Sequence, residues 1–369
     1  MTTNTILYPD YENSILCIPN SLLSHYGAAA HCASHPRLDA LLAQGFRNVV
    51  LMVFDGMGAD MLAHTLPPGA FLRRHMDTTL TSVYPSTTTA AITTFESGLP
   101  PIVHGWLGWS CYFDALKQAV ELFTNKTDEG KEAAPYNVAD RHLHYAVIDD
   151  QIRAAAPEVE VYRVSPFSRT HYAATAAEVC THVRTLCQAP GRKFVYAYHP
   201  RPDWDMHDHG SNAEPVKQLI KHIDDEISRL CVTLKDTLVL VTADHGMTDT
   251  KDVYLSDTPE IAECLALPPS IESRCLSLFV KEEYKATFAD RFQDRFGADF
   301  LLWSKEEALN SGIFGTGTPH PQALAFMGDY IAPATGKIRI AKPNRPKFAA
   351  MHAGLRPEEM IVPLITAEC

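Results

Sequence analysis

Three aspartates and three histidines of this sequence follow short apolar runs, or the loops after them, and their types suggest shared chemistry. They are Asp55, Asp203, His207, Asp244, His245 and His352. Carboxylate oxygens and imidazole nitrogens without thiolates form a ligand set that zinc and manganese accept. A pair of such ions suits displacement at phosphorus, with one ion on the attacking oxygen and one on the leaving oxygen. The sequence therefore predicts a site for two divalent metal ions, with zinc as the first candidate and manganese as the second.

A nucleophile for this chemistry stands in residues 84–92 (YPSTTTAAI), which are typical of a loop that opens a helix, with Ser86 as a possible cap. A hydroxyl in the first turn lies where free backbone N–H groups and the helix dipole favour an anion. A metal ion bound to that hydroxyl would lower its pKa and make it an alkoxide nucleophile. Spacing alone does not choose among Thr87, Thr88 and Thr89.

Structural explanations compete with each of these fragments taken alone. An Asp-Gly pair after a strand, such as Asp55-Gly56, is usually a turn. Acid and histidine pairs spaced like Asp203 and His207 are common by chance, and the threonines could serve only as caps and helix surface. It is the joint occurrence of the fragments that favours a metal site with a hydroxyl nucleophile.

Other catalytic motifs do not occur in the chain. It has no GxSxG elbow of an α/β-hydrolase and no GxxxxGK[ST] phosphate loop. Gly56-Met57-Gly58 begins a dinucleotide-binding pattern, but Met61 stands at the third glycine position. Met57 also stands where an aspartyl-phosphate phosphatase has its second acid, and residues 86–90 lack the Pro-x-Arg of a sulfatase.

The elements that must position the candidate residues are buried strands. Residues 46–54 (FRNVVLMVF), 193–198 (KFVYAY) and 236–242 (DTLVLVT) are apolar runs without in–out alternation, as in parallel strands covered on both faces. Residues 214–230, between two of these runs, carry apolar side chains at helical spacing. Strands that alternate with helices predict an α/β fold with a mostly parallel sheet, and ligands bind such sheets at the carboxyl ends of the strands.

The chain has no internal repeat and no Gly/Ser linker, so domain boundaries must come from changes in pattern. Residues 36–255 and 343–369 are predicted to form the α/β catalytic core. Residues 256–342, with a charged helix-like stretch and a Gly- and Pro-rich segment, are predicted to form a smaller subdomain appended over one edge of the sheet. Residues 1–35 are expected to wrap the core, and residues 111–160 are a weaker candidate for a second insertion.

Charge and composition restrict the partners of the protein. The 32 Lys and Arg residues against 44 Asp and Glu residues give a formal net charge of −12, which argues against nonspecific nucleic-acid binding. No run approaches the roughly 20 apolar residues of a membrane span, and the first residues lack the basic region of a secretory signal. The nine cysteines form no CxxC pair. We therefore predict a cytoplasmic enzyme that acts on a small molecule, without nucleic-acid or membrane partners and with an undefined oligomeric state.

Seven segments of the chain match the motifs of one known family. They are Val53–Gly58 (VFDGMG), Tyr84–Thr88 (YPSTT), Ser97–Leu99 (SGL), His104–Gly105 (HG), Pro202–Gly210 (PDWDMHDHG), Ala243–Met247 (ADHGM) and His352–Pro363 (HAGLRPEEMIVP). In these motifs the chain resembles the alkaline phosphatase superfamily and, within it, the type I phosphodiesterase/nucleotide pyrophosphatase family. The resemblance runs from about Asn48 to the C-terminus and is much less specific in the predicted subdomain.

The resemblance implies an alkaline phosphatase-like fold, a doubly wound sheet with helices on both faces, and its register selects Thr88 as the nucleophile. One metal ion would be held by Asp55, Thr88, Asp244 and His245, and the other by Asp203, His207 and His352. The implied activity is hydrolysis of a phosphodiester or pyrophosphate bond through a threonine alkoxide and a phospho-threonine intermediate. The alternatives are a phosphonate hydrolase, a phosphomonoesterase or mutase on the same fold, and a non-catalytic metal-binding relative.

Two positions depart from the family pattern. Thr89 stands where nucleotide pyrophosphatases have an aromatic residue that stacks on a base, and Trp109 stands where they have an asparagine that donates to a phosphoryl oxygen. These departures weaken the prediction of a nucleotide substrate and leave the phosphoryl charge to the metal ions and the backbone N–H groups near Thr88. Four nearby aromatic residues could line an apolar pocket or pack in the core: Trp106, Trp109, Tyr112 and Phe113.

The stretch that holds the nucleophile has no cationic residue. No Arg or Lys lies between Arg74 and Lys117. A monoester brings two negative charges to the site and a diester only one, so we predict that diesters are cleaved faster. A cationic side chain that reached the site from Lys337–Arg345 would overturn this prediction.

Overall fold

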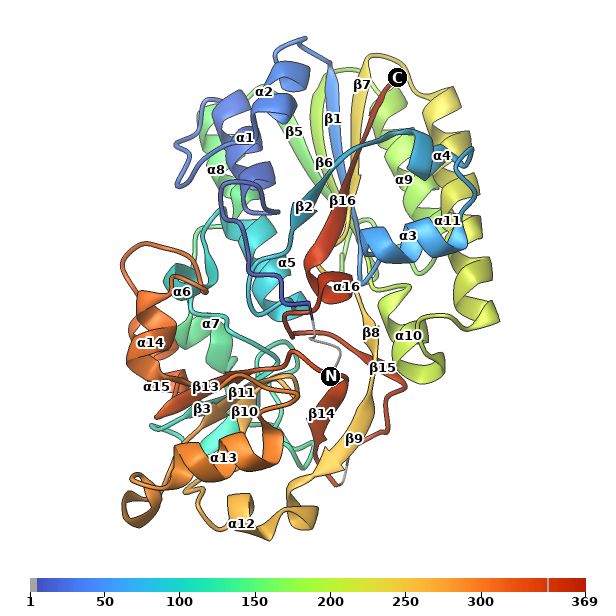
Figure 1. Cartoon of the computed structure of the whole chain (residues 1–369). Helices are drawn as coiled ribbons and strands as arrows, with labels where there is room; N and C mark the ends of the chain where they lie inside the picture. The colour runs from blue at the N-terminus through green and yellow to red at the C-terminus, as the bar shows by residue number, and fades with distance from the viewer. Residues whose placement is uncertain (1–4, 344) are drawn as a thin grey trace.

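The structure is a computed structural model that describes residues 5–343 and 345–369. Two sheets of six strands each lie one beyond the other along the length of the molecule (Figure 1). The first is flanked by helices on both sides, and the second, near the bottom of the view, has helices along its margin. The region between the two sheets is where the carboxyl ends of the parallel strands of the first sheet are found.

The first sheet is the mostly parallel sheet that the apolar runs predict. Its order is β2 (Met76–Thr81), β16 (Ile361–Glu368), β7 (Thr237–Thr242), β1 (Asn48–Phe54), β6 (Arg192–His199) and β5 (Val159–Val164). Strand β1 pairs in parallel with β6 and β7, and β5 pairs in parallel with β6, whereas β16 is antiparallel to β2 and β7. Every residue of β1 and β7 is buried, as expected of a strand covered on both faces.

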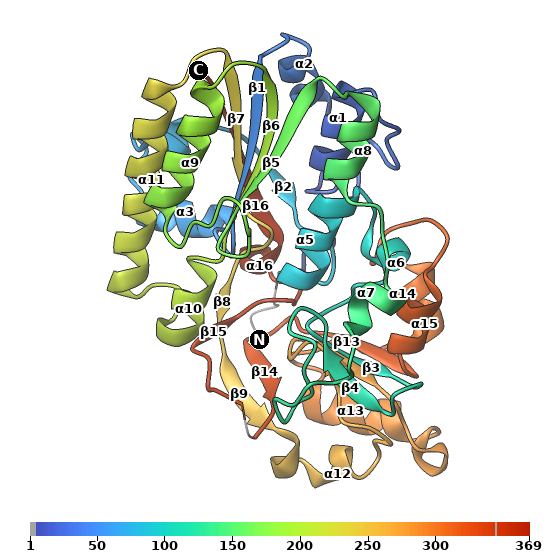
Figure 2. The ribbon, with the colours of Figure 1, turned by 180° about the vertical axis from the view of Figure 1, so that it is seen from behind.

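Helices cover both faces of this sheet, which confirms the predicted α/β fold (Figures 1 and 2). One face carries α1 (Cys17–His25), α2 (Pro36–Leu42), α5 (Thr88–Ser97) and α8 (Ile148–Ala155). The other carries α3 (Ala59–Thr65), α4 (Phe71–Arg74), α9 (Ala176–Gln188) and α11 (Glu214–Thr233). The apolar pattern of helix α11 explains why it covers the sheet. Its residues Val216, Ile220, Ile223 and Ile227 recur at helical spacing and are fully buried.

The second sheet is antiparallel and joins two distant segments of the chain. Its order is β12 (Trp303–Ser304), β13 (Tyr330–Pro333), β11 (Cys275–Leu278), β10 (Ser270–Ile271), β3 (Ser110–Phe113) and β4 (Gln118–Glu121). Phenylalanines of α13 (Phe288–Phe296) pack against β11 in a separate apolar cluster, while α14 (Lys305–Asn310) and α15 (Pro321–Phe326) contribute to another. The sheet thus contains strands from both segments that were predicted to be insertions. The predicted domain boundaries stay a prediction.

Short elements connect the two sheets. Two-stranded ribbons pair β9 (Lys251–Tyr254) with β14 (Ile338–Ala341) and β8 (Thr248–Asp249) with β15 (Ala350–Met351). The remaining helices are α6 (Pro101–His104), α7 (Val138–His142), α10 (Asp203–His209), α12 (Pro259–Ala262) and α16 (Pro357–Met360), with 3-10 turns at Leu255–Asp257 and Glu282–Tyr284. The N-terminal segment also spans both parts, because Ile15 N donates to Thr81 O and the Tyr11 hydroxyl donates to Ile313 O.

The described helices and the cysteines give no further indication of function. Among the described residues, no helix has both the length and the apolar character that crossing a membrane would take. All nine cysteines are free, and seven of them are buried. They behave as small apolar side chains of the core.

Candidate active site

The loops after three parallel strands bring the predicted acidic and histidine residues together. Asp55 follows β1, Asp203 opens helix α10 after β6, and Asp244 and His245 follow β7. Ligand atoms of Asp55, Asp244 and His245 lie within 4.8 Å of one another, and so do those of Asp203, His245 and His352. Because parallel strands end at the same edge of a sheet, residues far apart in the sequence meet at this point.

The remaining histidine lies one helical turn from its carboxylate. His207 Nε2 is 3.2 Å from Asp203 Oδ2, as the i,i+4 spacing on α10 dictates. His352 reaches the same carboxylate from the far side, with its Nε2 3.8 Å from Asp203 Oδ1. All six predicted side chains therefore belong to one cluster, and that they ligate metal ions stays a prediction.

Of the three candidate threonines, only Thr88 reaches this cluster. Its Oγ1 lies 3.1 Å from His245 Nε2 and 3.4 Å from each carboxylate oxygen of Asp55. Thr87 instead donates its hydroxyl to Glu272, and the Oγ1 of Thr89 is buried without a hydrogen-bond partner. Thr88 is also the first residue of α5, and the side chain of the cap residue Thr87 accepts no hydrogen bond from the first turn, so backbone N–H groups there stay available.

The three imidazoles of the cluster share one tautomer. The Nδ1 atoms of His207, His245 and His352 lie 2.8, 2.8 and 3.2 Å from backbone carbonyl oxygens. A carbonyl oxygen can only accept, so each Nδ1 carries the ring proton and each Nε2 turns a lone pair toward the carboxylates. A hydrogen bond of this kind is what orients histidines that bind metal ions.

The carboxylates are buried with too few donors for their oxygens. Asp55, Asp203 and Asp244 are at most 4% exposed, and Asp203 Oδ1 and Asp244 Oδ2 have no hydrogen-bond partner. Burial, followed by the neighbouring carboxylates of Asp244 and Asp203, raises the pKa of Asp55 well above its ordinary value. Burial also raises the pKa of Asp244 to about 7. Buried carboxylates that disfavour one another's charge and lack donors are stabilised by cations.

Histidine protonation follows from the same surroundings. Burial lowers the pKa of His352 well below its ordinary value, with the neighbouring His245 acting in the same direction. Although burial opposes it, the carboxylate of Asp203 raises the pKa of His207 to about 9. The cluster therefore holds a proton between Asp203 and His207 when no other cation is present.

Gly246, which follows His245, is packed closely against the backbone of Glu358. A Cβ at this position would collide with the carbonyl oxygen of Glu358. Gly246 N also donates to Glu359 O, which joins the loop after β7 to α16. The glycine of the Ala-Asp-His-Gly segment is thus needed for the close approach of two backbones rather than for a turn.

The cluster opens into a large cleft between the two sheets. The cleft has a volume of about 1850 Å³, and Asp55, Thr88, Asp203, His207 and His352 line it, whereas Asp244 and His245 do not. Four exposed aromatic side chains also line it: Trp109, Phe123, Phe167 and Trp204. A cleft of this size and lining suits a small organic molecule with an apolar group.

The four aromatic residues considered from the sequence separate into two groups. Trp109 lines the cleft and is 39% exposed. Trp106 is buried and donates its indole N–H to Leu143 O, and Phe113 is buried against Phe326. Tyr112 packs on Phe279 and is not among the residues that line the cleft. Core packing is therefore the role of Trp106 and Phe113.

Two residues at the site, Tyr198 and Glu272, were not predicted from the sequence. The Tyr198 hydroxyl donates to Asp55 Oδ2 from the end of β6. Glu272, from the loop after β10, accepts hydrogen bonds beside Thr88. The position of Tyr198 at the end of a predicted buried strand could have identified it, whereas nothing local distinguishes Glu272.

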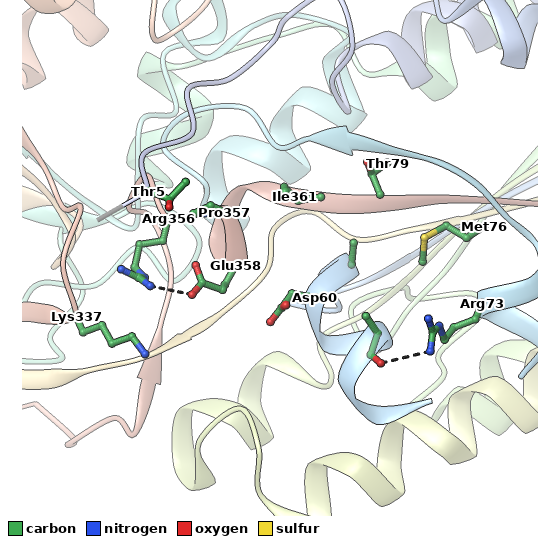
Figure 3. A pocket seen from close by; sticks show the side chains of 12 residues that line it. Thr5, Asp60, Arg73, Met76, Thr79, Lys337, Arg356, Pro357, Glu358 and Ile361 are labelled. Atoms are coloured by element: carbon green, nitrogen blue, oxygen red, sulfur yellow. Dashed lines mark hydrogen bonds and ion pairs between the residues drawn. The ribbon is translucent and has the colours of Figure 1, made fainter. Parts of the chain in front are cut away.

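A second cavity has a volume of about 960 Å³ (Figure 3). Arg73, Lys337 and Arg356 line it together with Asp60 and Glu358, and Arg356 pairs with Glu358 at 2.9 Å. None of the predicted site residues lines this cavity. Of these two cavities, only the large cleft is lined by predicted site residues.

The fold and the gathered acidic and histidine side chains agree with a phosphoester hydrolase of the alkaline phosphatase superfamily. Residues 49–283 match the family described as type I phosphodiesterase / nucleotide pyrophosphatase. The chain belongs to this family. Among curated protein sequences none matches the chain significantly.

Solved structures agree with this assignment at the level of the fold. Murine ectonucleotide pyrophosphatase / phosphodiesterase 5 (ENPP5) is 16% identical, with 87% of this chain and 88% of that chain covered and a TM-score of 0.62. Human ENPP5 is 16% identical, covers 87% of each chain and has a TM-score of 0.63. Phosphonoacetate hydrolase from Sinorhizobium meliloti 1021, in complex with phosphonoformate, is 14% identical with coverages of 92% and 93% and a TM-score of 0.66. The predicted alkaline phosphatase-like fold is confirmed.

Proposed function

We propose that the protein is a two-metal phosphodiesterase, similar to nucleotide pyrophosphatases, in which Thr88 is the nucleophile. The observation that carries the proposal is the position of the Thr88 hydroxyl. It stands at the first residue of α5, 3.1 Å from His245 Nε2 and 3.4 Å from both oxygens of Asp55. Family membership supports the class of reaction. The cleft supports a small-molecule substrate.

The donor set fits a pair of divalent cations. It combines three buried carboxylates, two of which have an oxygen without a hydrogen-bond partner, with three imidazoles that are oriented through Nδ1 and present Nε2 to the cluster. In the proposed division, one ion is held by Asp55, Thr88, Asp244 and His245, and the other by Asp203, His207 and His352. His245 lies within reach of both groups. Such ions, when bound, supply Lewis-acid stabilisation of negative charge on oxygen, and zinc is our first candidate.

The chain itself supplies the nucleophile, a hydrogen-bond acceptor for its hydroxyl and donors to the phosphoryl group. The Thr88 hydroxyl gives up its proton, Oγ1 attacks phosphorus, and the alcohol of the ester leaves in line. Asp55 lies close enough to accept a hydrogen bond from that hydroxyl. Backbone N–H groups of the first turn of α5 are placed to stabilise a phosphoryl oxygen. Water then cleaves the phospho-threonine, which releases phosphate or a monoester and restores the hydroxyl.

Two measurements test the nucleophile. Thr88→Ala is expected to abolish turnover of bis(4-nitrophenyl) phosphate on metal-loaded protein while most of the metal stays bound, because several other ligands remain. Mass spectrometry of wild-type protein quenched during turnover of this diester should find one 4-nitrophenyl phosphoryl group on Thr88. Thr89→Ala is the matched control, since Thr89 is the next residue of α5 and its hydroxyl has no partner. Wild-type activity in Thr88→Ala would refute the assignment, and Thr87 would be tested next.

Comparing this diester with phosphonoacetate and an aryl monoester separates the alternatives. A phosphonate hydrolase on this fold would release phosphate from phosphonoacetate rather than cleave the aryl diester, and a phosphomonoesterase would prefer the aryl monoester. A non-catalytic relative would bind metal and turn over none of them. The identity of the metal and a cytoplasmic location remain predictions that metal analysis and fractionation of cells would check.

A further inference from the structure

Glu272 lies beside the nucleophile although it belongs to the second sheet. It follows β10 and lines the cleft together with Thr87 and Thr88. Its Oε1 accepts two hydrogen bonds of 2.7 Å, one from the Thr87 hydroxyl and one from the backbone N–H of Trp109. These two donors hold the carboxylate at the start of α5, where phosphoryl oxygens are expected.

The second oxygen of this carboxylate is unused. Among the described residues, none donates to Glu272 Oε2, and none forms an ion pair with Glu272. Glu272 is half-buried, and Oε2 is not enclosed by protein. Burial raises the pKa of Glu272, while the hydrogen bonds from Thr87 and Trp109 oppose that rise. The free oxygen thus faces the cleft as an unpaired acceptor.

Three cations of residues 337–345 line the cleft, and each is paired with an acid. Lys342 lies 2.7 Å from Asp128, and Arg345 forms ion pairs with Asp128 and Glu121. Arg339 lies 2.6 Å from Asp252. These three residues therefore contribute neutralised ion pairs at the wall of the cleft.

A carboxylate at the start of α5 repels a negatively charged substrate. Like charges a few ångströms apart repel strongly in a partly desolvated cleft, and each further negative oxygen on phosphorus adds to the repulsion. A monoester dianion carries one more negative charge on its phosphoryl group than a diester. The carboxylate therefore penalises the monoester more than the diester.

We propose that Glu272 is a specificity-determining residue that makes the site select singly charged phosphodiesters over dianionic phosphomonoesters. This inference rests on the proposed phosphoester hydrolysis and names the substrate class of the same site. The Trp109 position, where the family pattern has a donor to phosphoryl oxygen, supplies its backbone N–H to Glu272 instead.

The variant that tests the inference is Glu272→Gln. A glutamine amide oxygen can accept the same two hydrogen bonds, so the local fold should persist, while the free oxygen becomes an N–H donor and the negative charge disappears. Glu129→Gln is the matched control, because Glu129 lines the same cleft and also accepts a hydrogen bond from a threonine hydroxyl, that of Thr127. Glu272→Ala is a second neutral variant that must shift specificity in the same direction.

The first readout is the ratio of kcat/KM for bis(4-nitrophenyl) phosphate to kcat/KM for 4-nitrophenyl phosphate. It is measured on metal-loaded protein at pH 8.5, well above the usual carboxylate pKa of about 4. Glu272→Gln should lower this ratio by at least about tenfold, which corresponds to about 1.4 kcal/mol, mainly by a gain on the monoester. Glu129→Gln should leave it within about twofold. An unchanged ratio in folded Glu272→Gln overturns the inference.

The second readout is independent of turnover. Calorimetry on the metal-loaded Thr88→Ala protein, with and without Glu272→Gln, should show about tenfold tighter binding of inorganic phosphate when the carboxylate is removed, and a smaller gain for dimethyl phosphate, which carries one negative charge. Equal phosphate affinities, or no phosphate binding to either protein, overturn the inference. If the wild type hydrolyses neither ester, the proposed function fails, and the calorimetric comparison still decides the role of Glu272.

Discussion

The hydroxyl of Tyr198 offers a sharp test of how the proposed metal-binding side chains are held in place. It donates to Asp55 Oδ2 from the end of β6, where Tyr198 also stacks on Phe167. Asp55 is only 2% exposed, so water cannot easily replace a lost donor. The change Tyr198→Phe removes this one hydrogen bond and keeps the ring, and Asp55 should then be oriented less firmly toward Thr88 and His245.

The size of the effect follows from the strength of that bond. A hydrogen bond to an ionised group contributes about 1.5–3 kcal/mol, and every 1.4 kcal/mol is a factor of about ten in an equilibrium constant. We therefore expect metal affinity to fall by about 10–100-fold. Loss of an outer partner of a metal-ligating residue typically has an effect of this size.

The assay is competition for zinc between the protein and a chelator of known affinity, followed by kcat/KM at saturating zinc. Tyr196→Phe is the matched control, because Tyr196 lies two residues earlier on β6 and its buried hydroxyl has no hydrogen-bond partner. Zinc should bind Tyr196→Phe as tightly as the wild type. If Tyr198→Phe also binds zinc with wild-type affinity, the Tyr198 hydroxyl does not position Asp55, and the reasoning is wrong.

Three further predictions concern metal, stability and pH. Exhaustive chelation should inactivate the enzyme, and zinc or manganese should restore it; full activity in protein shown to be free of metal would contradict the two-metal site. Glu359→Gln should lower the free energy of unfolding by about 3–5 kcal/mol in urea titrations, because it leaves the fully buried Arg274 guanidinium without its carboxylate partner; a loss below about 1 kcal/mol would speak against this. Burial lowers the pKa of His104 to about 3, so the unfolded chain binds its proton first as pH falls below 6.5. Stability should therefore drop between pH 6.5 and 4.5 by up to about 1.4 kcal/mol per pH unit, and His104→Asn should make the slope shallower; equal slopes would show that His104 is not responsible.

The members of the active-site cluster could be predicted from the sequence because the information is local. Residues 46–54 and 236–242 are continuous apolar runs that can only be buried strands, and Asp55, Asp244 and His245 follow them at once. Parallel strands end at one edge of the sheet, so residues directly after them must meet there whatever the rest of the chain does. The i,i+4 spacing of Asp203 and His207 is equally local.

The second sheet could not be predicted in the same way. Its strands β3 and β10 are only a few residues long and pair across a gap of more than a hundred residues. No periodicity in such short segments specifies an antiparallel partner, so the sequence separated residues 111–160 from residues 256–342. The burial of Trp106 depends on this sheet, and only the structure shows that its indole faces the core rather than the cleft.

The sequence by itself determined the α/β fold, the reaction class and the side chains that gather at the carboxyl edge of the sheet. Only the tertiary structure decided what surrounds the phosphoryl position. The carboxylate of Glu272 comes from a loop of the second sheet, and Lys342 and Arg345 form ion pairs with Asp128 and Glu121. The physical reason is that a residue's identity sets its chemistry, whereas its nearest charged neighbours depend on long-range packing that no local pattern encodes.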